Sequence, residues 1–119
     1  MTDVSDDDFY LMANFFPSDT GLPMVVWASE RGHARHDVRV KCLPQARTGV
    51  NQSHGTRMLP GNLAVVAVRP SPRLVVGQLS PADLQAVSQW IVLNEAALVA
   101  YWEGTISTVE LVRRLQRLP

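Results

Sequence analysis

Two histidines and an aspartate lie close together in the segment Gly32-His33-Ala34-Arg35-His36-Asp37. Imidazole nitrogens and a carboxylate are ligands for zinc, iron or copper. A histidine near neutral pH, oriented by a carboxylate, can also act as a general acid or base. Neither an H-E-x-x-H helix nor a second ligand pair accompanies these residues, and the same pattern is typical of a polar turn with exposed imidazoles. We therefore predict no cofactor, no metal and no complete catalytic set. A small metal-dependent or histidine-based hydrolase at His33, His36 and Asp37 remains an alternative.

Basic residues surround this segment. Residues 31–73 hold eight Arg or Lys against the single acidic Asp37, whereas residues 1–8 hold four aspartates; the whole chain balances at 11 basic and 11 acidic residues. Arg31, Arg35 and Arg39 complete a candidate ligand or anion site with His33, His36 and Asp37, because guanidinium groups bind anions with two hydrogen bonds. With Lys41 they could also form a stripe that binds a phosphate backbone. Nucleic-acid or polyanion binding through an Arg-rich sheet face is therefore a second alternative. It lacks one usual feature, because Trp27 is the only aromatic residue of these predicted strands that could stack on a base.

The elements that must position these residues are strands. Leu22–Ser29 is rich in β-forming residues, and Asp37–Leu43 alternates apolar with charged residues, which is typical of a half-buried strand. The two are close enough to form a hairpin across Glu30–His36. Residues 63–68 and 73–78 form a second predicted hairpin around the Arg69-Pro70-Ser71-Pro72 connection, which cannot be helical.

Helices follow the strands. Ser80 is a good N-cap, Pro81 suits the first helical position, and apolar residues then recur at helical spacing to about residue 103. A shorter C-terminal helix is predicted to begin at Ser107 or Thr108. Strands followed by helices favour an α+β domain: about four antiparallel strands in two hairpins, packed by one long helix and one short helix.

The long helix carries an unusually wide apolar arc, which suggests burial against the sheet and against a second surface. Trp90, Tyr101 and Trp102 are candidate interface residues, since aromatic side chains are enriched in protein interfaces, although core positions are the commoner use of such residues. A homodimer along this helix is therefore expected as one mode of association. Cys42 alternates with Val38 and Val40, which predicts a buried, unreactive thiol.

The chain is expected to form a single domain over residues 9–119, preceded by a flexible acidic tail at 1–8. Its 119 residues are 46% hydrophobic, which is enough for a core. The irregular stretch Pro44–Asn62 is long for a small domain and is predicted to be a functional or mobile loop. No apolar run approaches the roughly 20 residues that cross a bilayer. An acidic start and one unpaired cysteine favour the cytoplasm.

Two tryptophans at the middle and the end of the long helix also carry a resemblance. Leu79–Glu103 resembles part of a group of small bacterial proteins known as domains of unknown function, through Trp90-Ile91-Val92-Leu93-Asn94 and Tyr101-Trp102-Glu103. That group has a His-Pro-Pro-His-x-His turn after its first strand, where this chain holds His33 and His36 without the two prolines and the third histidine. The resemblance covers about half the chain. It implies a compact bacterial α+β protein that partners other proteins in toxin–antitoxin or similar regulatory systems.

The sequence therefore predicts a non-enzymatic interaction or regulatory module. Its surface would be the His/Arg turn, the basic sheet face or a helix-mediated homodimer. A protein partner or a second copy is the expected binding partner, with nucleic acid as the alternative and no membrane partner.

Overall fold

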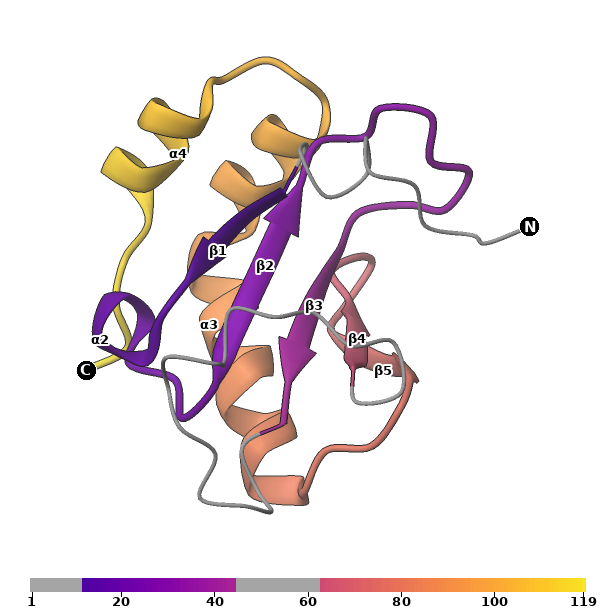
Figure 1. Cartoon of the computed structure of the whole chain (residues 1–119), viewed down its shortest axis with the longest axis vertical. Helices are drawn as coiled ribbons and strands as arrows, with labels where there is room; N and C mark the ends of the chain where they lie inside the picture. Colours follow the sequence, from indigo (N-terminus) through magenta and orange to yellow (C-terminus); the bar gives the residue numbers. More distant parts are fainter. Residues whose placement is uncertain (1–11, 45–62) are drawn as a thin grey trace.

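The computed structural model describes residues 12–44 and 63–119. Within this part of the chain, the strands form one antiparallel sheet in chain order, β1-β2-β3-β4-β5 (Figure 1). The elements are β1 (Met12–Phe15), α2 (Pro17–Thr20), β2 (Val25–Ser29), β3 (Arg39–Leu43), β4 (Ala64–Ala67), β5 (Arg73–Val76), α3 (Pro81–Trp102) and α4 (Thr108–Arg114). The predicted acidic tail and nearly all of the predicted loop lie outside the described residues.

The α+β class is confirmed, as are both hairpins, β2 with β3 and β4 with β5. The predicted number of about four strands is corrected to five. The additional strand is β1, which pairs antiparallel with β2, so that Met12 lies opposite Ser29 and Phe15 opposite Val26. The sequence around Met12–Phe15 shows no clear two-residue alternation, and these four residues form a strand by pairing with β2.

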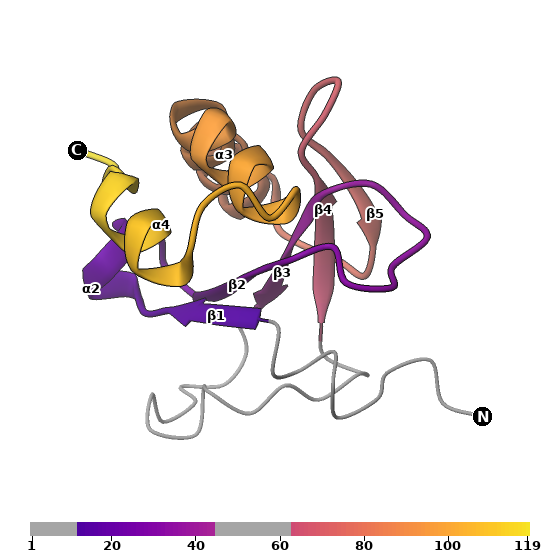
Figure 2. The same ribbon diagram turned by 90° about the horizontal axis from the view of Figure 1, so that it is seen from above.

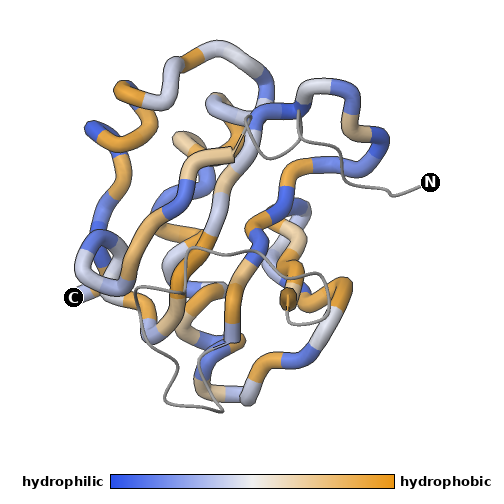
Figure 3. Tube along the Cα trace, in the orientation of Figure 1, coloured by the Kyte–Doolittle hydropathy of each residue, from blue (hydrophilic) through white to orange (hydrophobic). Residues whose placement is uncertain are grey.

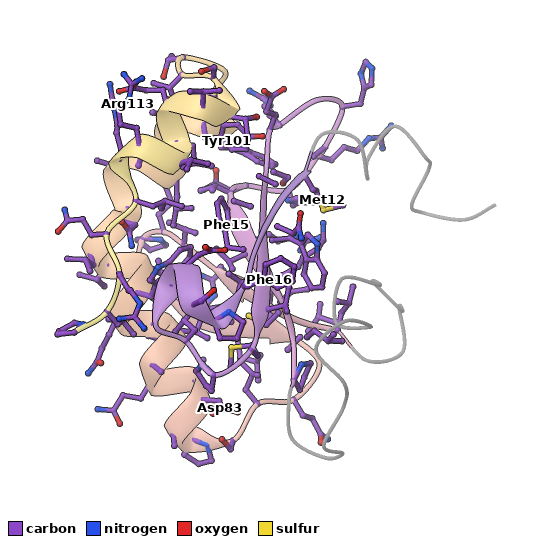
Figure 4. The ribbon with its side chains drawn as sticks, turned by 60° about the vertical axis from the view of Figure 1, so that its left-hand side comes forward. Met12, Phe15, Phe16, Asp83, Tyr101 and Arg113 are labelled. Carbon is purple, nitrogen blue, oxygen red and sulfur yellow. The ribbon has the colours of Figure 1, made fainter. Side chains whose placement is uncertain are left out.

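The two faces of the sheet carry different residues, because opposite residues on neighbouring strands share a face. One face packs Val26, Val40 and Val66 into the core under the helices, each at most 1% exposed (Figure 2). The other face carries Trp27, Lys41 and Val65 in one row. In Figure 4 the labelled Phe15 lies toward the helices, and Met12 lies on the other side of β1.

Local signals place both longer helices. The backbone N–H of Asp83 donates to Oγ of Ser80 over 3.1 Å, which is the N-cap bond expected for α3. Oγ of Ser107 accepts from the N–H of Glu110 over 3.1 Å and begins α4. The sequence left the start of the short helix open between Ser107 and Thr108, and the structure assigns the cap to Ser107.

A C-terminal strap, residues 115–119, closes the helical layer. Asn94, buried in α3 at 3% exposure, binds the main chain of Gln116 on both sides: its Nδ2 donates to the carbonyl oxygen over 3.0 Å, and its Oδ1 accepts from the N–H over 2.7 Å. The N–H of Leu118 then donates to the carbonyl oxygen of Thr20 over 2.8 Å. The strap thus connects α3, through Asn94, to the last residue of α2, Thr20.

Candidate functional site

The segment richest in candidate site residues is the connection between β2 and β3. It projects beyond the sheet and forms a largely hydrophilic run (Figure 3). The N–H of Ala34 donates to the carbonyl oxygen of Arg31 over 2.8 Å and closes a four-residue turn. Gly32 occupies the second position with a φ of 51°, a left-handed conformation that glycine adopts without steric cost. The turn therefore fixes the backbone positions from which Arg31 and His33 project their side chains.

A bidentate ion pair holds the end of this connection. Arg69, in the connection between β4 and β5, donates from Nε to Oδ2 of Asp37 over 2.8 Å and from Nη2 to Oδ1 over 2.9 Å. Oε2 of Glu103, just beyond α3, lies 3.7 Å from the same Nη2. Hydrogen bonding from Arg69 lowers the pKa of Asp37 from 3.8 to about 2. Because both side chains are partly exposed, water screens the pair, and its main effect is to fix geometry.

A second anchor joins the connection to the end of α3. The imidazole of His36 stacks on the indole of Trp102, with ring centroids 5.3 Å apart and an interplanar angle of 30°. Its Nδ1–H donates to the carbonyl oxygen of Asp37 over 2.8 Å. The N–H of Arg31 donates to the carbonyl oxygen of Trp102 over 2.9 Å. We call residues 30–38, held in this way, the braced turn.

The environment of His36 disfavours its charged form. Burial against Trp102 and its surroundings lowers the pKa of His36 below 6.5, and the positive charges of Arg39 and Lys41 lower it further, against an opposing effect of the hydrogen bond to Asp37. The ring is therefore mostly neutral near pH 7. Its role is structural: the ring packs on Trp102 and donates one hydrogen bond, and in this way it helps to hold the braced turn.

Besides Asp37, which is bound to Arg69, three side chains of the braced turn are exposed: Arg31, His33 and Arg35. Within the described part of the chain, none of the three forms a side-chain hydrogen bond or an ion pair. The positive charge of Arg31 also helps to lower the pKa of Asp37, by less than the hydrogen bond from Arg69 does. The brace thus presents two guanidinium groups and one imidazole to solvent from a fixed backbone.

The predicted basic stripe divides between two places. Arg39 and Lys41 lie on β3, on the sheet face turned away from α3, whereas Arg31 and Arg35 lie in the braced turn. Lys41 Nζ lies 4.0 Å from Sδ of Met12. The Nε of Arg39 is buried and has no hydrogen-bond partner among the described residues, and burial lowers the pKa of Arg39.

Two further basic residues, Arg69 and Arg73, lie near the second hairpin and in different environments. Arg69 is bound to Asp37, as described above. Arg73 aligns with Arg39 across Ala67, so that the face turned away from α3 carries cations on both β3 and β5. Trp27 on the same face is only 5% exposed, which leaves little of its ring for stacking with a base.

The three residues considered for metal or acid–base chemistry do not converge. His36 faces Trp102, Asp37 is bound to Arg69, and His33 is exposed. Among residues 12–44 and 63–119, no three His, Cys, Asp or Glu side chains gather closely enough to hold a metal ion. A carboxyl group with a pKa of about 2, bound by a guanidinium, is also a poor proton acceptor near neutral pH.

The three candidate interface aromatics are core residues in the structure. Trp90, Tyr101 and Trp102 are 0%, 2% and 3% exposed, and the hydroxyl of Tyr101 lies 2.9 Å from Oγ1 of Thr108. These three rings are therefore not available to a partner of the folded chain. Trp102 does take part in the candidate site, as the stacking partner of His36.

Sequence reasoning missed Arg69, Trp102 and Glu103 as parts of the site. Arg69 comes from the connection between β4 and β5, whereas Trp102 and Glu103 come from the C-terminal end of α3, and no local pattern links them to residues 36 and 37. Only the meander of strands and the return of α3 across the sheet bring them together.

Comparisons of the chain with protein-family models, with curated proteins and with solved structures find no significant match. The resemblance of Leu79–Glu103 to small bacterial domains stays a prediction. No helix in the described ranges has both the length and the apolar character needed to cross a membrane. The case for a function therefore comes from the geometry of the braced turn.

Proposed function

We propose that the protein is a non-enzymatic interaction module of the bacterial cytoplasm, and that the braced turn binds an acidic segment of a partner protein. The observation that carries the proposal is a division of roles within seven residues. His36 and Asp37 fix the turn, while Arg31, His33 and Arg35 stay exposed and unpaired within the described part of the chain.

The brace favours binding because a fixed loop loses little conformational freedom when a partner docks. Guanidinium groups then form charge-assisted hydrogen bonds with carboxylates. Two unpaired arginines match the carboxylates of an acidic peptide. A phosphate backbone is a weaker match, because six or more such contacts are common in nucleic-acid complexes and Trp27 is buried.

The test uses capture from the native host, with the amount of each co-purified protein measured against wild type. The variant Arg31→Gln/Arg35→Gln removes the two exposed charges. The control Arg113→Gln/Arg114→Gln removes two charges from α4, which lies outside the turn. We expect at least a roughly tenfold loss of the partner with the first variant, because two charge-assisted bonds at about 1 kcal/mol each are lost. The control should keep the partner.

A third variant separates binding from bracing. Arg69→Gln leaves Arg31 and Arg35 in place but removes the bidentate pair with Asp37. We expect Arg69→Gln to weaken capture of the partner by less than Arg31→Gln/Arg35→Gln does. The loss should reflect the conformational freedom that the backbone of the turn regains without the ion pair. Equal capture by wild type and Arg31→Gln/Arg35→Gln would refute the proposal.

Nucleic-acid binding is the second candidate, supported by Arg39, Lys41 and Arg73 on the sheet face turned away from α3. It predicts that nucleic acid elutes from the captured protein as salt rises. It also predicts that Arg73→Gln lowers this amount, whereas Arg31→Gln/Arg35→Gln leaves it unchanged.

A further inference from the structure

The face of the sheet turned away from α3 collects positive charge. Arg39 and Lys41 lie on β3. Arg73 lies on β5, and only the small Ala67 of β4 separates it from Arg39. We call Arg39, Lys41 and Arg73 the cationic patch. None of the five described strands contains an acidic residue, so none of them supplies a carboxylate to this face.

Part of the guanidinium group of Arg39 lacks a partner. Its Nε is buried and has no hydrogen-bond partner among the described residues. Trp27 and Val65, on the same face, are each only 5% exposed, although α3 and α4 lie on the opposite face (Figure 2). A partly desolvated cation is stabilised by an anion beside it. Low exposure on a sheet face that carries no described helix favours an anion from the same chain.

The chain has one strongly acidic segment. Residues 1–11 contain no Arg or Lys and hold four aspartates: Asp3, Asp6, Asp7 and Asp8. Residues 45–62, which also lie outside the described part of the chain, hold two arginines and no acidic residue. The cationic patch would therefore repel residues 45–62 and attract the acidic segment.

The acidic segment joins the sheet beside the cationic patch. It leads into β1 at Met12, which lies opposite Ser29 of β2. Continuing the register of β2 and β3 by two residues places Ser29 beside Arg39, so Met12 begins the row of the sheet that ends at Arg73. Lys41 extends across β2 toward the same place, since its Nζ lies 4.0 Å from Sδ of Met12.

We infer that the acidic segment binds the cationic patch of its own chain, with Asp8 paired to the cations of β3 and Asp6 paired to Arg73. An extended chain advances about 3.3 Å per residue, so Asp8 reaches about 13 Å from Met12 and Asp6 about 20 Å. Neighbouring strands are about 4.8 Å apart, which places β3 about 10 Å and β5 about 19 Å from β1. Residues two apart in an extended chain project to the same side, as this pairing requires.

Two further considerations favour this pairing. The tether gives the aspartates an effective concentration in the millimolar range, so weak ion pairs are enough to hold them. The braced turn is the other basic surface of the described chain, but it already holds the carboxylate of Asp37, and Glu103 lies beside Arg69. A separate polyanion would have to displace the acidic segment from the sheet face.

The test is paramagnetic relaxation measured by NMR on the full chain. A nitroxide is attached to Ser5→Cys, whose thiol reacts selectively because the native Cys42 is buried. Amide signals of β5 report whether the segment reaches the far edge of the sheet. The variant Asp6→Asn/Asp8→Asn removes the two paired carboxylates. Its matched control, Asp3→Asn/Asp7→Asn, removes two carboxylates that project to the other side of an extended segment.

We expect the label to broaden the amide signals of β5 in wild type and in the control. Asp6→Asn/Asp8→Asn should lower the binding constant at least about twofold and restore these signals, since each exposed ion pair contributes a factor of about 1.4–5. Salt at about 1 M should also restore them, and the exposed Arg73→Gln should do so in part.

Full-intensity β5 signals in wild type overturn the inference, and an equal effect of the two double variants overturns the pairing of Asp6 and Asp8. Broadening centred on residues 30–38 also overturns it, because the segment then binds the braced turn. Capture of a partner by the braced turn is measured with variants of Arg31 and Arg35, so either result leaves the proposed function to its own test.

Discussion

Removing the side chain of Asn94 should loosen the C-terminal strap and lower the stability of the whole domain. Its amide joins α3 to the main chain of Gln116 through one donated and one accepted hydrogen bond, and it also donates to the carbonyl oxygen of Trp90 over 3.0 Å. Asn94 is 3% exposed, so water does not replace these bonds freely when the side chain is truncated.

The expected size of the effect follows from the groups left behind. Asn94→Ala leaves the N–H and the C=O of Gln116 without their partner, and each part-buried group costs about 1–2 kcal/mol. Alanine is a better helix former than asparagine, which returns about 0.5 kcal/mol. We therefore expect a loss of about 2–3 kcal/mol in the free energy of unfolding. Against a total of about 5–15 kcal/mol, this should lower Tm by roughly 8–12 °C.

The assay is urea unfolding followed by circular dichroism, and Gln116→Ala is the matched control. The control removes an exposed side chain but keeps the main-chain groups that Asn94 binds, so its effect should stay within about 0.5 kcal/mol. Amide hydrogen exchange gives a local readout: the N–H of Leu118 donates to Thr20 and should exchange faster in Asn94→Ala. A loss below about 0.5 kcal/mol, or an equal loss in both variants, would show that the strap does not depend on Asn94.

Three further outcomes are expected. Gly21 and Gly104 both have φ near 80°, but a Cβ at Gly21 would lie 2.8 Å from the carbonyl oxygen of Leu118, whereas none of the described atoms comes within 4 Å of a Cβ at Gly104. Unfolding in urea should show a loss of about 1 kcal/mol for Gly104→Ala and a larger loss for Gly21→Ala. The folded-state pKa of His36 lies below 6.5, so as the pH falls the unfolded chain protonates His36 before the folded chain does. The contribution of neutral His36 to the free energy of unfolding should therefore be complete above pH 6.5 and fall as the pH drops toward the folded-state pKa. His36→Gln should remove this pH dependence. Burial raises the pKa of Cys42 to about 12, so a disulfide reagent should label the native thiol no faster than the domain opens and the denatured thiol within minutes.

The parts of the fold that the sequence predicts are those with short-range signals. The N-cap bond at Ser80 and the helical spacing that follows it gave α3 to within one residue at its end. The alternation of Asp37–Leu43 gave β3, because one face of that strand is buried and the other carries charge. In both elements, a residue's neighbours in sequence decide its environment.

The parts that the sequence does not predict depend on distant partners. Met12–Phe15 has no alternation of its own and becomes β1 because the open edge of β2 binds it. Pro17–Thr20 contains turn-forming residues, yet it forms a helical turn, in which Asp19 accepts from the N–H of Phe16 over 2.9 Å. Local propensity was too weak in both segments to decide the outcome.

The candidate site shows the same limit. The sequence singled out residues 31–37, and the structure brings them together with Arg69 and Trp102, which are 32 and 66 residues away from Asp37 and His36. A cluster of two histidines and an aspartate suggests chemistry as long as their side chains are free. Once Asp37 accepts two hydrogen bonds from a guanidinium and His36 stacks on an indole, the same residues hold the backbone instead.

This change of role favours the proposed binding over catalysis. A catalytic histidine needs a proton acceptor beside it and an open face toward a substrate, whereas in this turn one ring face of His36 is covered and its Nδ1–H is bound to a main-chain carbonyl. A binding loop needs the opposite arrangement: a backbone that is fixed before the partner arrives, with side chains that remain unpaired. Arg31 and Arg35 meet that second requirement, because the N–H of Arg31 is itself bound to the carbonyl oxygen of Trp102 and Arg35 directly precedes His36 and Asp37. The proposed interaction module is therefore supported by the roles that their contacts give to His36 and Asp37, which fix the backbone, and to Arg31 and Arg35, which stay unpaired within the described part of the chain.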